Sequence, residues 1–377
     1  MGSGRRFILD GSMVWGGGGL TFLNGIVPWL ARLSPDDSFR VFVRNPRCVE
    51  QIPALPNLEI ELLQGKGFIG RFRFTTLRAP RIARSWKADL LFSFGDYAPP
   101  WSPCPVIASC QNPNVFTELD QGWVWYDVLR LRILRALAGL SARRCARILF
   151  VSQDSARWMG DAIGLPEGKR LWLHHGLDLE DWGSADSPGP AREQGPILSV
   201  SSIYRYKNYL RLMEAYALLL RRGLALPDLL IAGDDQDPEY YVQMKELKQR
   251  LGEIGERIHF LEGVPYEEIR DLYAAARLFV FPSYLETFGI PLIEALASGL
   301  PVVASDIPVF REIAADAPLY VDPHDTESIA GGIERLLFDD ETRQSHARRS
   351  RQRAREFSWE RSARKLLGTF DEVLAGS

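Results

Sequence analysis

The feature that most constrains this chain is the alternation of short apolar runs with amphipathic stretches along its whole length. The apolar runs are typical of buried strands, and the stretches between them carry apolar residues at three- and four-residue spacing, as expected of helices. This alternation predicts βα units that assemble into parallel sheets. The predicted strands are residues 7–10, 39–44, 88–94, 105–109 and 147–152 in the first half, and 197–202, 228–233, 258–263, 278–283, 301–306 and 318–322 in the second half.

One segment poor in apolar residues divides the chain. Residues 183–196 read GSADSPGPAREQGP and contain almost nothing to bury. A length of 377 residues is sufficient for two domains that each have a core. We therefore expect an N-terminal domain at 1–182, a linker at 183–196 and a C-terminal domain at 197–356. The predicted fold class is α/β, with two Rossmann-like parallel-sheet domains that face each other across a cleft. Ligands of such sheets bind at the carboxyl ends of the strands.

Composition excludes several classes of function. Hydrophobic residues make up 46% and charged residues 25% of the chain, as in globular proteins, and the net charge of −3 gives no field that favours nucleic acid. The four cysteines form no Cys-x-x-Cys pair, which is compatible with a reducing cytosol and offers no metal-ligand cluster. Apolar runs fall short of the roughly 20 residues that span a bilayer. We expect a cytoplasmic protein.

Two glutamates stand eight residues apart in the segment ETFGIPLIEALASGLPVVASD, residues 286–306. The segment follows a predicted strand and contains a predicted helix that begins near Pro291. Glu286 is therefore expected in the strand-to-helix loop and Glu294 in the first helical turn. Carboxylates are strong acceptors for pairs of sugar hydroxyls.

The residues between the two glutamates predict an anion-binding helix start. Gly289 allows the backbone to approach a ligand closely, and the N–H groups of Phe288, Gly289 and Ile290 are expected to point toward it. A helix N-terminus favours negative charge. The pattern is that of a site for an activated sugar.

This segment resembles the Glu-x7-Glu signature of retaining GT-B glycosyltransferases of family 4. The resemblance extends from WGGGGLTFL near the start, through HHGLDLEDW, to FSWERSARKLLGTF near the end. It implies that Glu286 and the amides after it hold the donor sugar, and that Glu294 holds the ribose hydroxyls of the nucleotide. It also implies that a C-terminal helix at about 357–377 packs back on the first domain.

Two cations follow the first predicted strand of the second domain. Arg205 and Lys207 precede a helix, where charge and backbone N–H groups together can hold a diphosphate. Lys207 matches the family motif, whereas the family arginine five residues earlier is Ser202 here, and we interpret Arg205 as its replacement. Fixed cations stabilise a leaving nucleoside diphosphate. No Asp-x-Asp ends a strand of the first domain, so no bound metal is expected.

Two glycine-containing loops complete the predicted donor site. The sequence WGGGGLTF is not in register with a dinucleotide-binding motif, and no acid ends the second predicted strand, which argues against NAD. Within the resemblance, Gly18 and Gly19 let this loop approach the donor phosphates or an acceptor. The loop at Gly263 and Val264 resembles the one that receives the nucleotide base.

The end of the fourth predicted strand differs from the family pattern. Many relatives have a histidine close to the sugar, whereas this chain has Gln111 and Asn112. Either amide can bind a sugar hydroxyl, but neither can act as a base. We interpret His174 and His175, in the crossover segment HHGLD, as packing residues.

Basic residues are segregated in the first domain. Residues 64–87 contain seven Lys or Arg and no acid, and residues 128–147 contain six Arg and no acid. Such segments suit an anionic leaflet, on whose inner face the protein would be peripheral, or a lipid-linked pyrophosphate acceptor. The alternative is that they are solvated helix faces paired with acids elsewhere. No RNA-binding module motif is present.

The resulting hypothesis is a hexosyltransferase that uses a nucleotide diphosphate sugar and a saccharide or lipid-linked saccharide acceptor, as in cell-surface polysaccharide synthesis. The resemblance implies front-face attack with retention, in which the departing diphosphate helps to deprotonate the acceptor. Three alternatives stay open: a glycoside hydrolase, a nucleotide-sugar epimerase of the same fold, and a non-catalytic nucleotide-sugar-binding protein.

Overall fold

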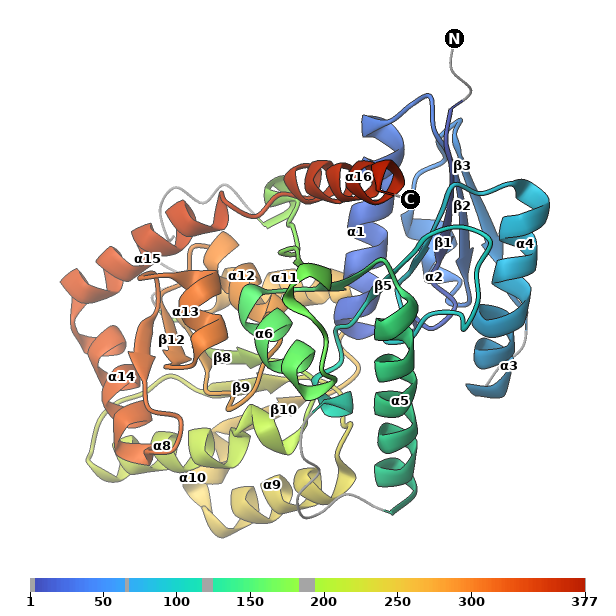
Figure 1. Ribbon diagram of the computed structural model, residues 1–377. Coiled ribbons are helices and arrows are strands. Elements are labelled where there is room, and N and C mark those ends of the chain that lie inside the picture. Colours follow the sequence, from blue (N-terminus) through green and yellow to red (C-terminus); the bar gives the residue numbers. More distant parts are fainter. Residues whose placement is uncertain (1–3, 65–67, 117–124, 183–193, 377) are drawn as a thin grey trace. The chain divides into compact units, whose positions relative to one another are not determined.

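The protein, described by a computed structural model over residues 4–64, 68–116, 125–182 and 194–376, divides into two compact units. Unit 1 comprises Met1–Leu177 and Ser358–Ser377, and unit 2 comprises Asp178–Phe357. The C-terminal helix thus belongs to the first unit (Figure 1). Most of the expected linker, residues 183–193, lies outside the described residues.

Unit 1 is built on a parallel sheet whose strand order is β3-β2-β1-β4-β5-β6-β7 in the described residues. Its strands are β1 (Arg6–Asp10), β2 (Ser38–Val43), β3 (Leu58–Leu62), β4 (Leu90–Ser93), β5 (Val106–Ser109), β6 (Arg147–Phe150) and β7 (Arg170–Trp172). The two outermost strands, β3 and β7, were not among the predicted strands. The central strands β4 and β5 are buried along their whole length, as expected of a parallel sheet covered on both faces.

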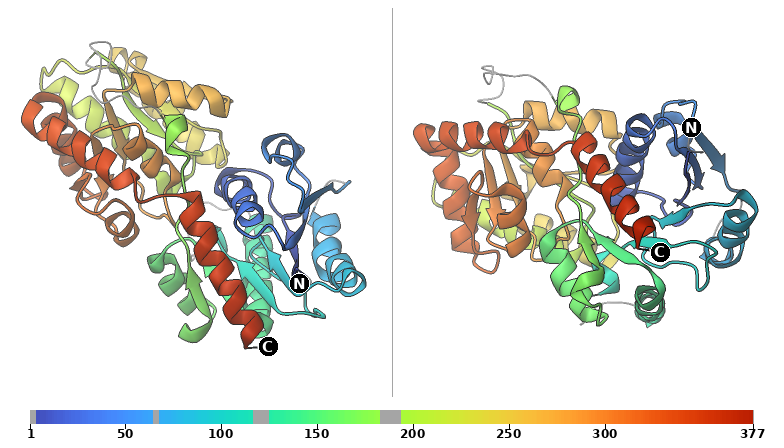
Figure 2. Two further views of the ribbon diagram at one scale, coloured as in Figure 1. Left: turned by 90° about the horizontal axis from the view of Figure 1, so that it is seen from above. Right: turned by 45° about the horizontal axis from the view of Figure 1, so that its top comes forward.

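Helices cover both faces of this sheet (Figure 1). They are α1 (Gly17–Leu33), α2 (Arg47–Gln51), α3 (Phe68–Arg73), the π-helical turn η1 (Phe74–Arg78), α4 (Ala79–Trp86), η2 (Pro113–Val115), α5 (Trp125–Arg144), α6 (Gln153–Ala162), η3 (Glu167–Lys169) and α16 (Trp359–Ala375). Helix α16 lies beside α1 in Figures 1 and 2. A Cβ atom at Gly25 would come within 2.1 Å of the Trp359 ring, so α1 and α16 pack closely only because residue 25 is glycine.

Unit 2 is built on a second parallel sheet, with strand order β10-β9-β8-β11-β12-β13. Its strands are β8 (Ile197–Val200), β9 (Leu229–Ala232), β10 (Ile258–Leu261), β11 (Leu278–Phe281), β12 (Val302–Ser305) and β13 (Leu319–Val321). Each lies inside one of the six ranges predicted for the second half. The prediction of two Rossmann-like parallel α/β sheets is confirmed.

The helices of unit 2 alternate with its strands. They are η4 (Leu179–Trp182), η5 (Arg205–Lys207), α8 (Tyr209–Arg221), α9 (Pro238–Arg250), α10 (Glu253–Glu256), α11 (Tyr266–Ala275), α12 (Ile290–Ala297), α13 (Pro308–Ala314), α14 (Thr326–Phe338) and α15 (Asp340–Ala354). Helices α8 and α14 pack against each other over a core that includes β8, β9 and β11. This core holds the carboxyl ends of the strands, and the loops that follow them, in place.

Candidate active site

The centre of the candidate site is a buried ion pair at the carboxyl edge of the unit 2 sheet. Lys207, at the end of η5, places its Nζ 2.6 Å from Oε1 of Glu286 in the loop after β11, and both side chains are 9% exposed. The hydroxyl of Ser283 donates to the same carboxylate oxygen at 3.3 Å. Removing one partner of a buried pair leaves an uncompensated charge, at a cost of roughly 3–5 kcal/mol. The two residues singled out separately in the sequence are therefore direct partners.

Backbone contacts explain why two loops from distant parts of the sequence meet at this pair. Asn208, in the left-handed conformation with φ 62°, donates from Nδ2 to the carbonyls of Pro282 and Pro323 at 3.0 and 2.8 Å. The N–H of Tyr284 donates to the carbonyl of Tyr206 at 2.8 Å. These bonds fasten the loop after β8 to the loops after β11 and β13 and so bring Lys207 to Glu286. Asn208 was not predicted from the sequence, where its signal was a polar residue directly before a helix.

Glu294 lies in the second turn of α12, not in the first turn as predicted, because the helix begins at Ile290. The side chain is buried, and its Oε2 accepts a hydrogen bond from the Tyr273 hydroxyl at 3.0 Å. Tyr273 comes from α11 and also donates to the Pro291 carbonyl. A buried carboxylate that is held at a defined position can accept hydrogen bonds from a pair of hydroxyls.

Gly289 gives the start of α12 its shape. Its φ is +91°, and a Cβ there would come within 3.0 Å of the Phe310 ring and 3.4 Å of the Phe281 ring. Only glycine combines this backbone conformation with such close neighbours. Phe288, just before it, is buried against Phe357, and Ile290 opens the helix. The N–H groups of Leu292 and Ile293 donate to the Gly289 carbonyl, and the helix dipole still makes this end suited to an anion.

The Arg205 guanidinium is paired with an acid, so it does not offer a full positive charge to a ligand. Its Nε and Nη2 lie 2.8 and 3.0 Å from the two carboxylate oxygens of Asp237, and Nη2 lies 3.6 Å from Glu239. The hydrogen bond to Asp237 is the main cause that raises the pKa of Arg205. Asp237 also caps α9 through the N–H of Tyr240. The guanidinium therefore ties the loop after β8 to the loop after β9.

Val264 lies in the short loop between β10 and α11, beside Gly263, whose φ is +65°. The N–H of Gly263 donates to Oδ1 of Asp234 at 2.9 Å, so this loop is attached to the loop after β9. Both loops follow strands of the same sheet, so Val264 lies on the same edge as the Lys207–Glu286 pair. Parallel sheets bind ligands at this edge.

Two tyrosines that the sequence did not single out lie next to the ion pair. The rings of Tyr204 and Tyr206 stack with centroids 5.1 Å apart and an angle of 11° between planes. Lys207 Nζ lies 5.1 Å from the Tyr206 ring and 5.6 Å from the Phe281 ring. The ammonium group is thus surrounded by aromatic faces, where a cation–π attraction adds to the ion pair.

In unit 1, Gly18 and Gly19 are helical rather than part of a loop. They lie in the first turn of α1, after Gly17 with φ +58°. The sequence placed them in the preceding turn because four consecutive glycines are unusual in a helix. A Cβ at Gly17 would meet nothing within 4 Å, so its positive φ, and not crowding, favours glycine there.

Gln111 and Asn112 follow β5 and are fixed by a half-buried acid, Asp96, that was not predicted from the sequence. Their N–H groups donate to Oδ1 of Asp96 at 3.1 and 3.3 Å, and the Gln111 side-chain amide donates to Ser109. Asn112 uses its own Oδ1 to cap the turn η2. Burial raises the pKa of Asp96 to about 6. The signal for Asp96 was an acid three residues after the buried strand β4.

Asp10 ends β1 and is buried. It accepts hydrogen bonds from the Thr75 hydroxyl at 2.7 Å and from the Ser12 N–H at 3.0 Å, and burial raises its pKa. These bonds join the loop after β1 to the π-helical turn η1. Sequence reasoning missed this acid as well, because it read FILD only as a strand.

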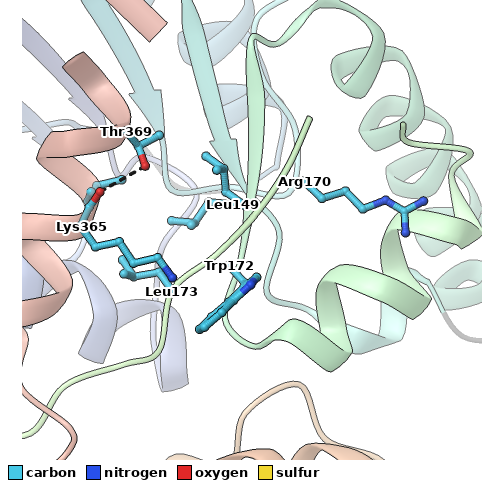
Figure 3. Close-up of a pocket in the computed structure, with 8 residues that line it drawn as sticks. Leu149, Arg170, Trp172, Leu173, Lys365 and Thr369 are labelled. Atoms are coloured by element: carbon cyan, nitrogen blue, oxygen red, sulfur yellow. Dashed lines mark hydrogen bonds between the residues drawn. The ribbon is translucent and has the colours of Figure 1, made fainter. Parts of the chain in front are cut away.

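A hollow of about 120 Å³ lies elsewhere on unit 1, between β7 and α16 (Figure 3). Lys365 extends from α16 so that its Nζ lies 3.4 Å from the centre of the Trp172 ring. The residues around this hollow include none of the predicted donor-binding residues. It is also smaller than the roughly 300–1,000 Å³ of usual ligand pockets.

Among the described residues, no three His, Cys, Asp or Glu side chains gather so as to hold a metal ion. No helix in the same parts of the chain combines the length and the apolar character needed to cross a bilayer.

Comparison with solved structures places this geometry in a known fold. The structure of Anabaena HepE in complex with UDP-glucose aligns with a TM-score of 0.76, at 17% identity, over 97% of this chain and 99% of that chain. The fold is GT-B. At this identity the likeness concerns the GT-B fold alone.

A family model matches most of unit 2. Residues 185–353 match the family described as glycosyl transferases group 1. The O-antigen chain mannosyltransferase B of Escherichia coli is 34% identical over 178 residues, 47% of this chain and 46% of that protein. The D-inositol 3-phosphate glycosyltransferase of Nocardia farcinica is 32% identical over 242 residues, 60% of this chain and 53% of that protein. The chain thus spans about half the length of the curated relatives it matches.

Proposed function

We propose that this protein is a retaining hexosyltransferase that moves a sugar from a nucleotide diphosphate donor to a hydroxyl of a saccharide acceptor. The observation that carries the proposal is the buried Lys207–Glu286 pair beside Glu294 and the start of α12, all within the segment that matches the glycosyl transferases group 1. A cation, two carboxylates and backbone N–H groups at a helix start are the chemistry that a sugar diphosphate requires.

Each group has a separate role in this proposal. Glu294 accepts the ribose hydroxyls, and the N–H groups at Phe288, Gly289 and Ile290 together with Glu286 hold the transferred sugar. Lys207 neutralises the diphosphate as the bond between its oxygen and the anomeric carbon breaks. The acceptor oxygen bonds to the same face of that carbon, and its proton passes to the departing diphosphate. We propose no metal, because a fixed ammonium group supplies the charge.

The ion pair adds a condition to this mechanism. While Glu286 neutralises Lys207, the pair offers little net charge to a diphosphate. We infer that donor binding loosens the pair, so that the ammonium turns to phosphate and the carboxylate to sugar hydroxyls. Arg205 contributes a second cation from the same loop, at a strength reduced by Asp237.

The acceptor is proposed to carry phosphate, as in a lipid-linked saccharide. Three arginines, Arg44, Arg71 and Arg78, lie near the carboxyl end of β2. Burial lowers the pKa of Arg44, and the like charges of Arg71 and Arg78 lower it further. Arg78 lies 3.5 Å from Glu61 on β3, and Arg44 donates to the Gln64 carbonyl. Arg71→Gln is expected to raise KM for a phosphate-bearing acceptor and to leave KM unchanged for the same saccharide without phosphate.

A binding screen tests the donor side directly. A ligand that binds the folded state raises the melting temperature, so UDP, GDP and their hexose derivatives are compared by thermal shift. We expect a selective rise with one nucleoside diphosphate and its sugar, and transfer of that sugar when acceptor is added. The absence of any shift across the panel would contradict the proposal. Incubation of the donor without acceptor separates transfer from epimerisation.

A further inference from the structure

The outward face of α5 combines apolar and basic residues in a way that the fold does not use. Leu129, Ile133 and Leu140 are 52%, 47% and 57% exposed, and Arg132 and Arg143 on the same face are also exposed. At 100° per residue these positions fall within a stripe about 100° wide. We call this stripe, with Trp101, the α5 surface.

The opposite face of α5 already supplies the packing that the helix needs. Leu131, Ala138 and Ala142 are buried in the unit 1 core, and Leu134 packs against it. The helix therefore has two apolar faces, of which only one is covered within the unit. A second, exposed apolar face on a helix marks a surface that contacts another partner or a membrane.

Four arginines of α5 have no acid partner among the described residues. No ion pair there involves Arg132, Arg135, Arg143 or Arg144; Arg135 donates to the Ala162 carbonyl and Arg144 to the Pro100 carbonyl. The nearby acid Asp161 is bound to Arg170. At these four positions the described residues therefore supply no acid that neutralises the arginines.

Trp101 extends the same chemistry beyond the end of α5. It is 39% exposed, follows the Pro100 that accepts the Arg144 hydrogen bond, and carries the Arg84 guanidinium 5.3 Å from its ring centre. Tryptophan with adjacent arginine is enriched where a protein meets the headgroup region of a membrane.

The geometry points to an anionic lipid bilayer as the partner: we propose that the α5 surface docks this protein on such a bilayer. From Leu129 to Arg143 the stripe is about 21 Å long at 1.5 Å per residue, and its aliphatic side chains can enter the acyl boundary while the arginines contact lipid phosphates. A second copy of the chain is disfavoured, because a symmetric interface would place the same unpaired arginines against each other. The proposal rests on the proposed function, which requires access to a lipid-linked acceptor.

The experiment measures sedimentation of the full chain with vesicles of equal parts phosphatidylglycerol and phosphatidylcholine, and with phosphatidylcholine alone. We expect binding to the anionic vesicles only, weakened in high salt. The double variant Ile133→Glu, Leu140→Glu is expected to lose at least about tenfold in affinity, and Arg132→Gln, Arg143→Gln about tenfold. Arg132→Lys, Arg143→Lys keeps the charge and should keep binding.

Matched controls separate docking from folding and from catalysis. Val242 and Phe338 are 52% and 50% exposed on unit 2, so Val242→Glu, Phe338→Glu makes the same chemical change away from α5 and should bind vesicles normally. Thermal shift with the nucleoside diphosphate verifies that each variant folds and binds donor. Vesicle binding that persists when no transfer is found would retain the docking surface and reject the proposed function.

Three results would overturn the docking proposal. The first is wild-type protein that does not prefer anionic vesicles. The second is a set of α5 variants that bind as the wild type does. The third is a dimer in solution that the Ile133→Glu, Leu140→Glu variant dissociates, which would assign the surface to a second copy.

Discussion

The carboxyl edges of the two sheets have similar backbones but carry different side chains. In unit 2 the edge is formed by charged groups bound to each other, with Lys207 on Glu286 and Arg205 on Asp237. In unit 1 the corresponding edge holds two acids that bind hydroxyl and backbone N–H groups, the buried Asp10 and the half-buried Asp96, and uncharged amides at Gln111 and Asn112. The proposed function requires this difference, because a donor of high charge would bind at the charged edge of unit 2, whereas in unit 1 the acids mainly hold loops in place.

The strongest test of this comparison is Glu286→Gln. Removing the carboxylate frees Lys207 but leaves a buried cation without its counter-charge, so the free protein should melt at a lower temperature. Nucleoside diphosphate affinity should rise several-fold, because the ammonium turns to the phosphates, while transfer falls about 10³-fold. Calorimetric titration and initial rates measure both. Weaker nucleotide binding would show that the pair does not compete with the donor.

Glu294→Ala is expected to have the next largest effect. Loss of a buried charged acceptor for two hydroxyls corresponds to roughly 2–3 kcal/mol, or about 30- to 150-fold in nucleotide affinity. Tyr273→Phe removes the hydroxyl that bonds this carboxylate and the Pro291 carbonyl, keeps the carboxylate itself, and should cost a few-fold. Glu214→Ala, on the exposed side of α8, is the matched control. Equal affinity in all three variants would remove Glu294 from the donor site.

The variant Asp96→Asn tests the unit 1 edge through the pH dependence of the unfolding free energy. The folded-state pKa of about 6 lies above the ordinary value of 3.8, so the folded protein binds more protons than the unfolded chain between these values. Stability therefore falls as pH rises through this window, by at most roughly 3 kcal/mol. The variant should lack this component. The unfolding free energy of the variant minus that of the wild type should therefore be higher at pH 8 than at pH 4.

Urea titrations at several pH values measure this difference. Asp36→Asn, at an exposed position of the same unit, controls for the loss of one negative charge. If the unfolding free energies of wild type and Asp96→Asn depend on pH in the same way, the environment of Asp96 does not disfavour its charged form. The two edges would then differ less.

The smallest expected effect is that of Arg205→Gln. Because Asp237 already neutralises this guanidinium, and because the pair is partly exposed, removal should change nucleotide affinity by only about two- to fivefold. Lys207→Gln, assayed in parallel, should weaken nucleotide binding much more. A larger loss in Arg205→Gln than in Lys207→Gln would reverse the roles assigned to the two cations.

The two units also differ in how many of their strands could be predicted from the sequence. All six strands of unit 2 were found, because each is a short apolar run between turn residues. In unit 1, β3 and β7 were missed. Both are outermost strands that are only half buried: β3 reads LEIEL, with two acids, and β7 is three residues long with an arginine. These two strands lack the continuous apolar pattern on which the prediction rests, whereas the outermost strands of unit 2, β10 and β13, are mainly apolar.

Errors of detail have local causes. Glu294 was assigned to the first turn because Pro291 was taken as a helix start without an exact boundary, and helix ends are the least certain feature of a pattern. The glycines at 18 and 19 were assigned to a loop because glycine has low helix propensity, which tertiary packing of α1 overrides. His175 was correctly expected to pack: it lies between the rings of Phe22 and Trp359.

The sequence alone determined the two parallel sheets and the identity of the charged residues, because strand burial and motif spacing are local properties of the chain. Only the tertiary structure decided that Lys207 and Glu286 form one ion pair, that Asp237 pairs with Arg205, and that α5 exposes a second apolar face. These depend on which side chains meet after residues far apart in sequence are brought together. A one-dimensional pattern records charge and periodicity, but it does not record which partner satisfies each charge.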